Sequence, residues 1–309
     1  MKKISVVTPC YNEESNVVAL YNRVREILKT RPGYAYEHIF IDNASTDGTP
    51  ALLRGLAAAD QNVKVIINTR NFGHIRSPFH GLMQAGGDAV VLLVADFQDP
   101  PEMINDFLRH WEAGYKVVLG IKTNSGESGL MFAVRKCYYH LVDGLAEVRI
   151  NKNNTGFGLY DKEVITQLKK LEEPYPFFRG LVSELGYEAA RVEYFQPARR
   201  RGITKNNFYT LYDIGMLGII NHSKVPLRLA IFAGGALAGI SLLGAFGYFV
   251  YKLVFWSSFS VGIAPVVIGL FFFSSVQLIF LGVIGEYVGA IYTQTLKRPL
   301  VIEKERINF

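Results

Sequence analysis

Two long apolar runs near the C-terminus most narrowly limit what this chain can fold into. Residues 225–251 and 263–285 contain a single charged side chain, Arg228, which lies near the start of the first run and can extend toward the interface. As helices that rise about 1.5 Å per residue, both runs are long enough to cross roughly 30 Å of hydrocarbon. Because only a short connection separates them, the sequence predicts a hairpin of two transmembrane helices.

Basic residues around this hairpin predict its orientation. Those at its outer ends are Lys224, Arg228, Lys297, Arg298, Lys304 and Arg306. By the positive-inside rule, both of these flanks face the cytoplasm. The first apolar stretch of the chain, which begins at Ile4, is too short and too weakly apolar to be a signal peptide. We therefore expect the N-terminal domain and both termini to be cytoplasmic.

The N-terminal two-thirds of the chain alternates short apolar runs with segments of helix length. The five apolar runs are 4–8, 38–41, 63–67, 89–95 and 116–119. Between them, apolar residues at helical spacing predict a helix that begins near Glu14, and 49–59 reads as a short helix. Such alternation predicts a parallel α/β sheet whose ligands bind at the carboxyl ends of the strands.

The character of the chain changes after Tyr194. A basic cluster appears, which consists of Arg199, Arg200, Arg201 and Lys205. Residues 207–222 then place apolar side chains along one helical side, as in an amphipathic helix at a membrane interface. The sequence thus predicts an α/β domain over 1–198, a basic segment with an interfacial helix over 199–224, and the hairpin with a cytoplasmic tail over 225–309.

The apolar run 89–95 leads directly into oxygen-bearing side chains, those of Asp96, Gln98 and Asp99. Hard oxygen ligands suit Mg²⁺ or Mn²⁺, ions that often accompany phosphates. We expect Asp96 to face the crevice at the end of its strand, whereas Asp99 is better explained as the N-cap of a helix that starts at the following prolines. The net charge of +6 suits a phosphate-rich ligand or an anionic lipid surface and does not separate them.

Several motifs stand in a fixed order before this junction: SVVTPCYNEE at 5–14, IDNASTDGT at 41–49 and NFG at 71–73. This series resembles the family 2 glycosyltransferases of the GT-A fold. With the arginine-rich segment and the hairpin, the whole chain resembles their polyprenyl-phosphate branch, which includes the GtrB-like and dolichyl-phosphate mannose synthase-like enzymes. The resemblance implies a Rossmann-like, mostly parallel sheet. It also implies inverting transfer of a hexose from a nucleotide sugar, with UDP favoured, to polyprenyl phosphate at the cytoplasmic face of a bacterial inner membrane.

The resemblance also implies roles for matching positions. The donor-binding positions are Pro9, Tyr11, Glu13, Asp42, Asn71 and Gly73. In such enzymes the first three hold the base and ribose, and the position of Asp42 contacts the base. Asp96 and Gln98 match residues that hold the divalent cation, Mg²⁺ or Mn²⁺, and the donor diphosphate. Asp96 is thereby a catalytic residue, because a cation there stabilises the departing nucleoside diphosphate without any proton transfer.

Three positions depart from the resembled pattern. The family usually carries a further acidic residue where this chain has Val94, and an Asp-Phe-Arg triplet where it has Gly156 and Gly158 on either side of a phenylalanine. The carboxylate usually assigned as the base is therefore absent. Glu184 is our candidate for a catalytic replacement, although a solvent-facing position on a helix explains that residue equally well.

The acceptor chemistry limits the cost of this loss. A lipid phosphate has a second pKa of about 6, so at neutral pH it is already largely a charged nucleophile and little proton has to move. Positioning the acceptor phosphate should then matter more than a base. We assign that task to Arg199, Arg200, Arg201 and Lys205. The alternative is that these residues bind lipid headgroups only, at about 1 kcal/mol each.

Several residues have two candidate roles, and the function has rivals. Asp42 and Asp47 could simply cap the helix at Thr49, and His74 could meet the diphosphate or be an ordinary surface histidine. The rival functions are a transferase with a different lipid acceptor, such as a glycolipid hydroxyl, and a non-catalytic scaffold that binds nucleotide sugar. By analogy with the resembled family we expect a homo-oligomer, specifically a tetramer, in contact with membrane lipids and without nucleic acid.

Overall fold

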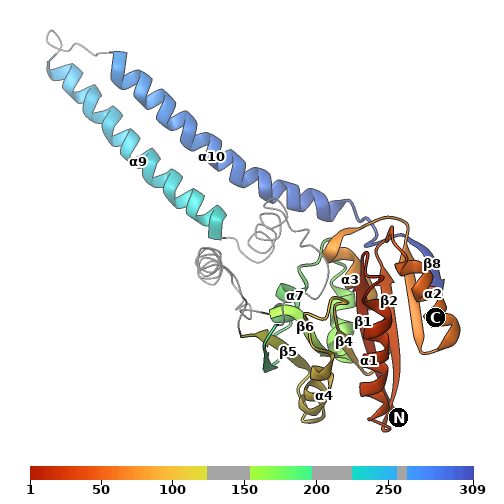
Figure 1. The fold of residues 1–309 in the computed structure, drawn as a ribbon. Coiled ribbons are helices and arrows are strands. Elements are labelled where there is room, and N and C mark those ends of the chain that lie inside the picture. The colour runs from red at the N-terminus through yellow and green to blue at the C-terminus, as the bar shows by residue number, and fades with distance from the viewer. Residues whose placement is uncertain (124–153, 197–224, 256–262) are drawn as a thin grey trace.

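The computed structural model describes residues 1–123, 154–196, 225–255 and 263–309. An eight-stranded sheet forms the centre of the α/β domain, with the strand order β7-β5-β6-β4-β1-β2-β3-β8 (Figure 1). The four parallel strands at its middle are β1 (Lys2–Cys10), β2 (Tyr34–Asp42), β3 (Val63–Asn68) and β4 (Ala89–Leu92). They correspond to four of the predicted apolar runs, so the α/β architecture expected from the sequence is confirmed.

Helices cover both faces of this sheet. On one face lie α1 (Val17–Lys29), α2 (Thr49–Ala59) and α4 (Ile104–Glu112), the last preceded by the short helix η1 (Pro101–Met103). The other face carries α3 (Gly73–Gln84), α6 (Lys162–Lys170) and α7 (Phe178–Glu184). Side chains of the central strands alternate between the two layers: Ile4 and Val6 join the first hydrophobic cluster, and Val7 joins the second. Burial on both faces explains why these strands are apolar at nearly every position.

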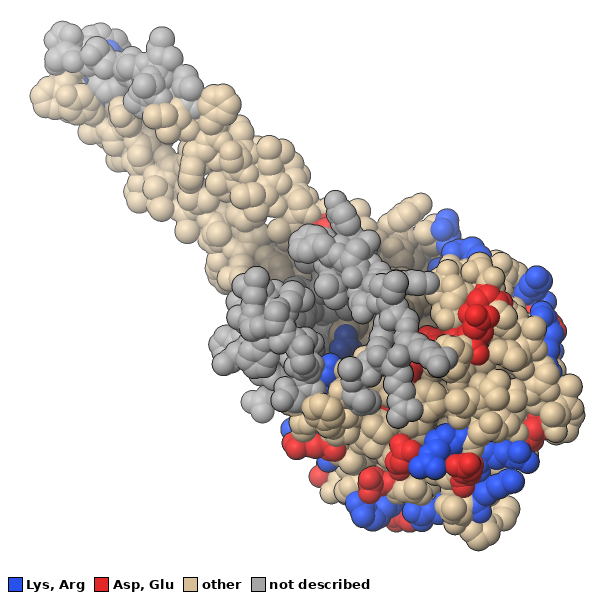
Figure 2. Space-filling view, viewed as in Figure 1, with Lys and Arg blue, Asp and Glu red and all other residues tan. Residues whose placement is uncertain are grey.

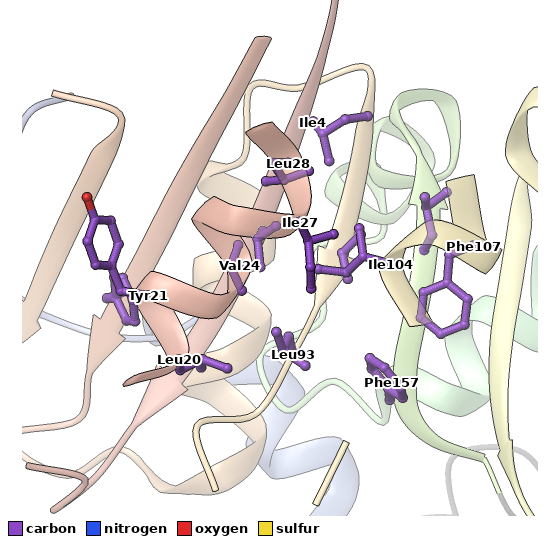
Figure 3. Close-up of a cluster of buried hydrophobic side chains, with 14 of the residues drawn as sticks. Ile4, Leu20, Tyr21, Val24, Ile27, Leu28, Leu93, Ile104, Phe107 and Phe157 are labelled. Carbon is purple, nitrogen blue, oxygen red and sulfur yellow. The ribbon is translucent and has the colours of Figure 1, made fainter. Parts of the chain in front are cut away.

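The first hydrophobic cluster shows how the sequence selects its helices. Leu20, Val24 and Ile27 lie one helical turn apart on α1 and are almost completely buried. Figure 3 shows them pointing toward Leu93 and the side chains of α4. Phe157 lies in the same cluster and packs edge-on against a phenylalanine of α4, with 4.9 Å between the ring centroids. This helical periodicity is what the sequence displays, although the helix begins at Val17 and not near Glu14.

The sheet is less uniformly parallel than a simple α/β alternation. The strand β6 (Asn154–Asp161) runs antiparallel to β4 and to β5 (Val117–Lys122), and β7 (Ala189–Tyr194) completes this side. The sequence analysis missed β6 because two glycines interrupt its pattern. The predicted run 89–95 also overestimates β4, which ends at Leu92. Leu93 still donates its backbone N–H to Val7, and the chain then turns away.

A buried carboxylate, that of Glu37, lies on β2. Glu37 is 1% exposed, and its carboxylate accepts hydrogen bonds from Lys3, Ser5, Lys64 and the backbone of Gly86. Burial alone would raise the pKa of Glu37, but these hydrogen bonds outweigh it and lower the pKa to about 2. The folded protein therefore stabilises the ionised form of Glu37.

We expect this carboxylate to make stability fall at acid pH. Because the folded pKa lies below the ordinary value of 4.5, the stabilisation is present above pH 4.5 and is lost as the pH drops toward 2. Glu37→Gln should be less stable at neutral pH and should lose less on acidification, as measured by the melting temperature against pH. Glu26→Gln, at an exposed helix position, is the control. Parallel pH profiles for the wild type and Glu37→Gln would contradict this assignment.

Two long helices follow the α/β domain along the chain. They are α9 (Val225–Val254) and α10 (Ile263–Thr295), and both contain stretches long and apolar enough to cross a membrane. They lie side by side and project away from the sheet (Figure 1), and Figure 2 shows their surface with almost no charged side chains, in contrast to the α/β domain. Since the candidate spans have no buried residues, they are not core helices of this chain. They extend past the predicted ends at 251 and 285.

The end of the chain returns to the sheet. The sequence analysis treated the residues after the hairpin as a tail, but Glu303–Ile307 form β8, which pairs antiparallel with the edge strand β3. Arg54 of α2 makes a two-pronged ion pair with Glu305 at 2.7–3.1 Å. Asn308 donates its side-chain N–H groups to the carbonyls of Ala57 and Val63, at 2.7 and 2.9 Å. These contacts attach the C-terminal end of α10 to the α/β domain.

We expect Asn308→Ala to loosen this attachment. The two backbone carbonyls that Asn308 satisfies would lose their partner, at a cost of about 1–2 kcal/mol in the free energy of unfolding. Thermal unfolding of the purified full chain measures the effect. Gln61→Ala, at an exposed amide in the turn before β3, should change little. If both variants melt like the wild type, the contacts of Asn308 do not hold the tail in place.

Candidate functional site

The carboxyl ends of β1, β2, β3 and β4 meet along one edge of the sheet. The loops that follow three of these strands each hold a residue other than glycine in a left-handed backbone conformation: Asn12 (φ 57°), Ala44 (φ 60°) and Phe97 (φ 59°). Such conformations cost free energy and tend to cluster at ligand sites. Their position agrees with the crevice that the parallel topology predicts.

The loops after β1 and β2 are joined by hydrogen bonds. The backbone N–H of Asn12 donates to Ser45 Oγ at 2.9 Å, and the Asn12 side-chain oxygen accepts the N–H of Thr46 at 2.8 Å. The N–H of Glu13 donates to Thr49 Oγ1 at 2.9 Å. Since Cys10 pairs with Asp42 in the sheet register, the structure brings together four predicted donor-binding positions, namely Pro9, Tyr11, Glu13 and Asp42.

Asp42 is completely buried at the end of β2. Its two carboxylate oxygens accept hydrogen bonds from the hydroxyl and the backbone N–H of Ser45, at 2.5 and 3.0 Å. Burial raises the pKa of Asp42, and the bonds from Ser45 oppose that shift. Gly48 occupies the N-cap position of α2, and the side chain of Asp47 accepts the N–H of Thr49 at 3.0 Å. Asp42 therefore points into its own loop and does not cap α2.

An amide network fixes the loop that contains Asn71 and Gly73. The side-chain N–H groups of Asn43 donate to Asn71 Oδ1 at 2.8 Å and to the carbonyl of Gly73 at 3.1 Å. The side-chain oxygen of Asn43 accepts the N–H of Phe72 at 2.9 Å. Gly73 has a φ of 87°, a conformation that favours glycine. Asn43 is thus an organising residue that the sequence analysis missed, although it lies inside the 41–49 motif.

The turn after β4 presents Asp96 and Gln98 at half-buried positions. The N–H of Gln98 donates to Asp96 Oδ1 at 3.1 Å, which shapes the turn. Asp99 is buried and accepts the hydroxyl hydrogen of Tyr194 at 2.6 Å, whereas Pro100 occupies the N-cap position of η1. The predicted N-cap role of Asp99 is therefore wrong. Burial raises the pKa of Asp99 to about 6, with a further contribution from Asp96, against the hydrogen bond from Tyr194.

The oxygen ligands at this turn can be compared with the needs of a divalent cation. Among the described residues, no group of three His, Cys, Asp or Glu side chains gathers to hold a metal. Asp96 supplies one carboxylate and Gln98 one amide oxygen, while Asp99 is occupied by Tyr194. Mg²⁺ commonly binds through one or two carboxylates together with substrate phosphates. These residues therefore fit a cation shared with a bound diphosphate, not one enclosed by protein alone.

Comparison with known proteins decides the family. The model of "Glycosyl transferase family 2" matches residues 5–168, which include all the crevice loops described above. The chain belongs to glycosyl transferase family 2. It has the GT-A architecture expected from the sequence, with a mostly parallel mixed sheet, and two apolar C-terminal helices follow.

Relatives match this family 2 glycosyltransferase over nearly its whole length. The "SfII prophage-derived bactoprenol glucosyl transferase" of Shigella flexneri is 35% identical, with 98% of both chains covered. The "Prophage bactoprenol glucosyl transferase homolog" of Escherichia coli is 32% identical with the same coverage. The "Uncharacterized glycosyltransferase YkcC" of Bacillus subtilis is 36% identical over 96% of this chain and 92% of its own. The similarity thus extends beyond the crevice to the two apolar helices.

The glycines that depart from the family pattern are demanded by the backbone of β6. Gly156 has a φ of 95°, which a residue with a side chain rarely adopts. At Gly158 a Cβ atom would lie 2.3 Å from the carbonyl oxygen of Val118 on the neighbouring strand. Neither an aspartate nor an arginine therefore fits this strand as it stands.

Arg179 of α7 supplies a positive charge near this strand. Its Nη1 donates to the carbonyl of Asn154 at 2.9 Å. Its charge opposes the burial that raises the pKa of Tyr160, and it adds to the desolvation that lowers the pKa of His74. His74 is exposed in the first turn of α3, beside the Asn71–Gly73 loop. The sequence analysis missed Arg179, whose only signal was a lone arginine in an apolar segment.

The remaining predicted site residues are Glu184 and four basic residues. Glu184 is exposed as the last residue of α7, and its charge adds to the burial that raises the pKa of Glu173. Phe178, at the other end of α7, is the residue that faces Gly156. The solvent-facing interpretation of Glu184 agrees with this exposure. Four predicted acceptor-binding residues lie outside the described residues: Arg199, Arg200, Arg201 and Lys205.

Proposed function

We propose that this family 2 glycosyltransferase is a membrane-anchored, inverting enzyme that moves a hexose from a nucleotide sugar, with UDP as the nucleotide, to polyprenyl phosphate. The observation that carries the proposal is full-length similarity to relatives named bactoprenol glucosyl transferase. An apolar hairpin joined to a donor crevice gives the physical reason. A soluble transferase needs no such hairpin unless its acceptor or its product is a lipid.

The crevice residues divide the work of holding the donor. Pro9, Tyr11 and Glu13 would line the base and ribose, with Asp42 against the base and the loop of Asn71 and Gly73 beside it. Asp96 and Gln98 would hold a divalent cation, Mg²⁺ or Mn²⁺, together with the diphosphate. When bound, such an ion stabilises the negative charge of the leaving group. The hydrogen bonds between these loops keep their side chains in place before the donor arrives.

The acceptor side explains how transfer can proceed without the usual carboxylate at Gly156. A lipid monophosphate is already largely ionised at neutral pH, so the chain has to position it and need not deprotonate it. We assign positioning to Arg199, Arg200, Arg201 and Lys205. Glu184 is retained only as a weaker candidate for proton transfer, because its position at the end of α7 is exposed.

The topology of the chain supports a two-span anchor. β8 returns the chain to the sheet a few residues after α10, so the C-terminal end of the hairpin is attached to the α/β domain. Basic residues at both outer ends of the hairpin favour the cytoplasmic side for that domain. We therefore propose a multi-pass protein of the bacterial inner membrane whose active site faces the cytoplasm, and we extend the proposal by analogy to a homo-oligomer, a tetramer in the first instance.

A donor and acceptor panel tests the proposal. The purified full chain is incubated with radiolabelled UDP- and GDP-hexoses, Mg²⁺ or Mn²⁺, and one of three acceptors: a short polyprenyl phosphate, the matching polyprenol or a glycolipid. We expect label in the organic phase with the phosphate and not with the alcohol. Label transferred to a glycolipid hydroxyl would favour the alternative acceptor. Donor binding without transfer to any acceptor would favour a scaffold.

A further inference from the structure

Three arginines meet where the second apolar helix ends against the α/β domain. Arg70 follows β3, Arg76 lies on α3, and Arg298 comes shortly after the last residue of α10, Thr295. Burial lowers the pKa of the Arg76 guanidinium, and the positive charges of Arg70 and Arg298 lower it further. The three side chains are distant in sequence, yet they lie within electrostatic reach of one another. We call them the arginine cluster.

Arg76 is held firmly but has unused hydrogen-bonding capacity. One of its terminal nitrogens donates to the carbonyl of Pro299, and its Nε is buried with no hydrogen-bond partner. The guanidinium carbons of Arg76 and Arg70 lie 5.5 and 4.1 Å from the ring centroid of Phe72. The ring therefore organises two guanidinium groups that would otherwise repel one another. A guanidinium with free donors is suited to an oxyanion such as a phosphate.

No carboxylate neutralises the cluster within the described parts of the chain. The arginines that do form ion pairs there are Arg23, Arg54, Arg109 and Arg306. Arg70, Arg76 and Arg298 are absent from those pairs. Arg76 is half-buried, whereas Arg70 and Arg298 are exposed. Partial burial of a cation without a counter-charge is unfavourable, and an anion bound by the cluster would offset that cost for Arg76.

A hollow of mixed polar and apolar lining includes Arg298 of the cluster. It has a volume of about 560 Å³ and lies between α3, α6 and the segment after α10. Its lining includes Phe79, Met83 and Leu300, and two of its basic residues are Lys297 and Arg298. The acidic residues Glu172 and Glu173 line it as well. Apolar side chains on part of the lining, beside basic groups at the end of a membrane-length helix, suit an amphiphile with an anionic head.

The cluster also adjoins the donor crevice. Asn71, which separates Arg70 from Phe72, accepts a hydrogen bond from Asn43 at 2.8 Å, and Asn43 directly follows Asp42. Arg298 follows the candidate span that ends at Thr295, so it lies within about 10 Å of the end of that span. An anion bound here therefore touches both the membrane end of α10 and the rim of the crevice.

We propose that Arg70, Arg76 and Arg298 bind the phosphate group of a membrane lipid whose hydrocarbon lies along the adjoining hollow and the end of α10. The same phosphate chemistry is offered by polyprenyl phosphate and by anionic phospholipids. The naming of polyprenyl phosphate rests on the proposed function, whereas the binding of a lipid phosphate does not. For the acceptor lipid, the cluster would be a docking point at the edge of the crevice.

Binding measurements on the full chain in neutral detergent test this inference. Farnesyl phosphate is the probe and farnesol its uncharged match, and the affinity for each is compared between the wild type, Arg76→Gln and Arg298→Gln. We expect farnesyl phosphate to bind about fivefold more weakly for each arginine removed, with farnesol unchanged and the donor KM preserved. Arg76→Lys should retain part of the affinity. Arg109→Gln, on an exposed face of α4, should bind like the wild type.

Arg298→Gln separates a loss of binding from a loss of folding, because Arg298 is exposed and its replacement should not disturb the fold. An unchanged affinity of this variant for both farnesyl phosphate and phosphatidylglycerol would overturn the proposal. A parallel series in nanodiscs of phosphatidylglycerol or phosphatidylcholine separates the sources of the phosphate. If the variants lose affinity for farnesyl phosphate only, the cluster binds the acceptor lipid. If they lose affinity for phosphatidylglycerol only, or for both lipids equally, the cluster binds phospholipids. Failure of sugar transfer with this binding intact would refute the proposed function and leave the inference standing.

Discussion

Gly158→Arg, which restores the arginine usual in the family, is expected to unfold the α/β domain instead of improving transfer. The first side-chain carbon alone would lie 2.3 Å from the carbonyl oxygen of Val118. That oxygen belongs to the backbone of β5, which pairs with β6 and with β7, so it cannot move without disturbing two ladders. Even Gly158→Ala should cost about 3 kcal/mol in the free energy of unfolding, and the larger side chain should cost more.

Thermal unfolding of the purified full chain measures both variants. Gly33→Ala is the matched control, because nothing lies within 4 Å of a Cβ atom at Gly33. We expect that control to melt within a degree or two of the wild type, since an open turn position with ordinary backbone geometry tolerates alanine. If Gly158→Ala were as stable as the control, the close approach of β5 to β6 would be wrong.

The same reasoning bears on the missing carboxylate. Gly156 has a φ of 95° and lies between Phe178 and Leu92, so an aspartate there would be strained whatever the space around it. A chain with this β6 conformation cannot present the usual base from that position. Under the proposed function, an acceptor that arrives already ionised removes the need for a carboxylate at this position, and a single substitution at Gly156 would not restore one.

The parts of the fold that the sequence predicted are those governed by local patterns. The central strands are apolar because both faces are buried, α2 has the predicted bounds Thr49–Ala59, and the long helices follow from uninterrupted apolar runs. Asp96 was identified because it directly follows such a run, whereas the donor-binding role of Asp42 came from the family resemblance. These features need no knowledge of the rest of the chain.

The parts that the sequence did not predict depend on distant partners. β8 carries alternating charges, which are typical of an edge strand, and it becomes a strand only by pairing with β3. Asp99 looks like a helix cap until Tyr194, far along the chain, binds it at 2.6 Å. The arginine cluster likewise brings together Arg70 and Arg298, which lie far apart in the sequence. No local pattern encodes such contacts.

Asp96→Asn is expected to lower kcat/KM for sugar transfer by about 10²–10³-fold while leaving the fold intact. The asparagine oxygen can still accept the N–H of Gln98, which Asp96 Oδ1 binds at 3.1 Å, so the turn should keep its shape. The variant loses only the negative charge. Because position 94 is Val94 and Asp99 is engaged by Tyr194, neither neighbour offers a replacement carboxylate. Asp106→Asn, at a surface ion pair with Arg109, is the control for removing a charge.

The decisive comparison combines Asp96→Asn with chelation of divalent ions. If Asp96 acts by holding a cation against the donor diphosphate, the variant and the chelator remove the same interaction, so their effects should not add. Wild-type activity with chelator should then fall to about the level of Asp96→Asn, and the variant should respond little to added Mg²⁺ or Mn²⁺. Asp106→Asn should keep the wild-type response to both ions. Full turnover of Asp96→Asn in the presence of chelator would show that the leaving group is stabilised by other residues of the crevice.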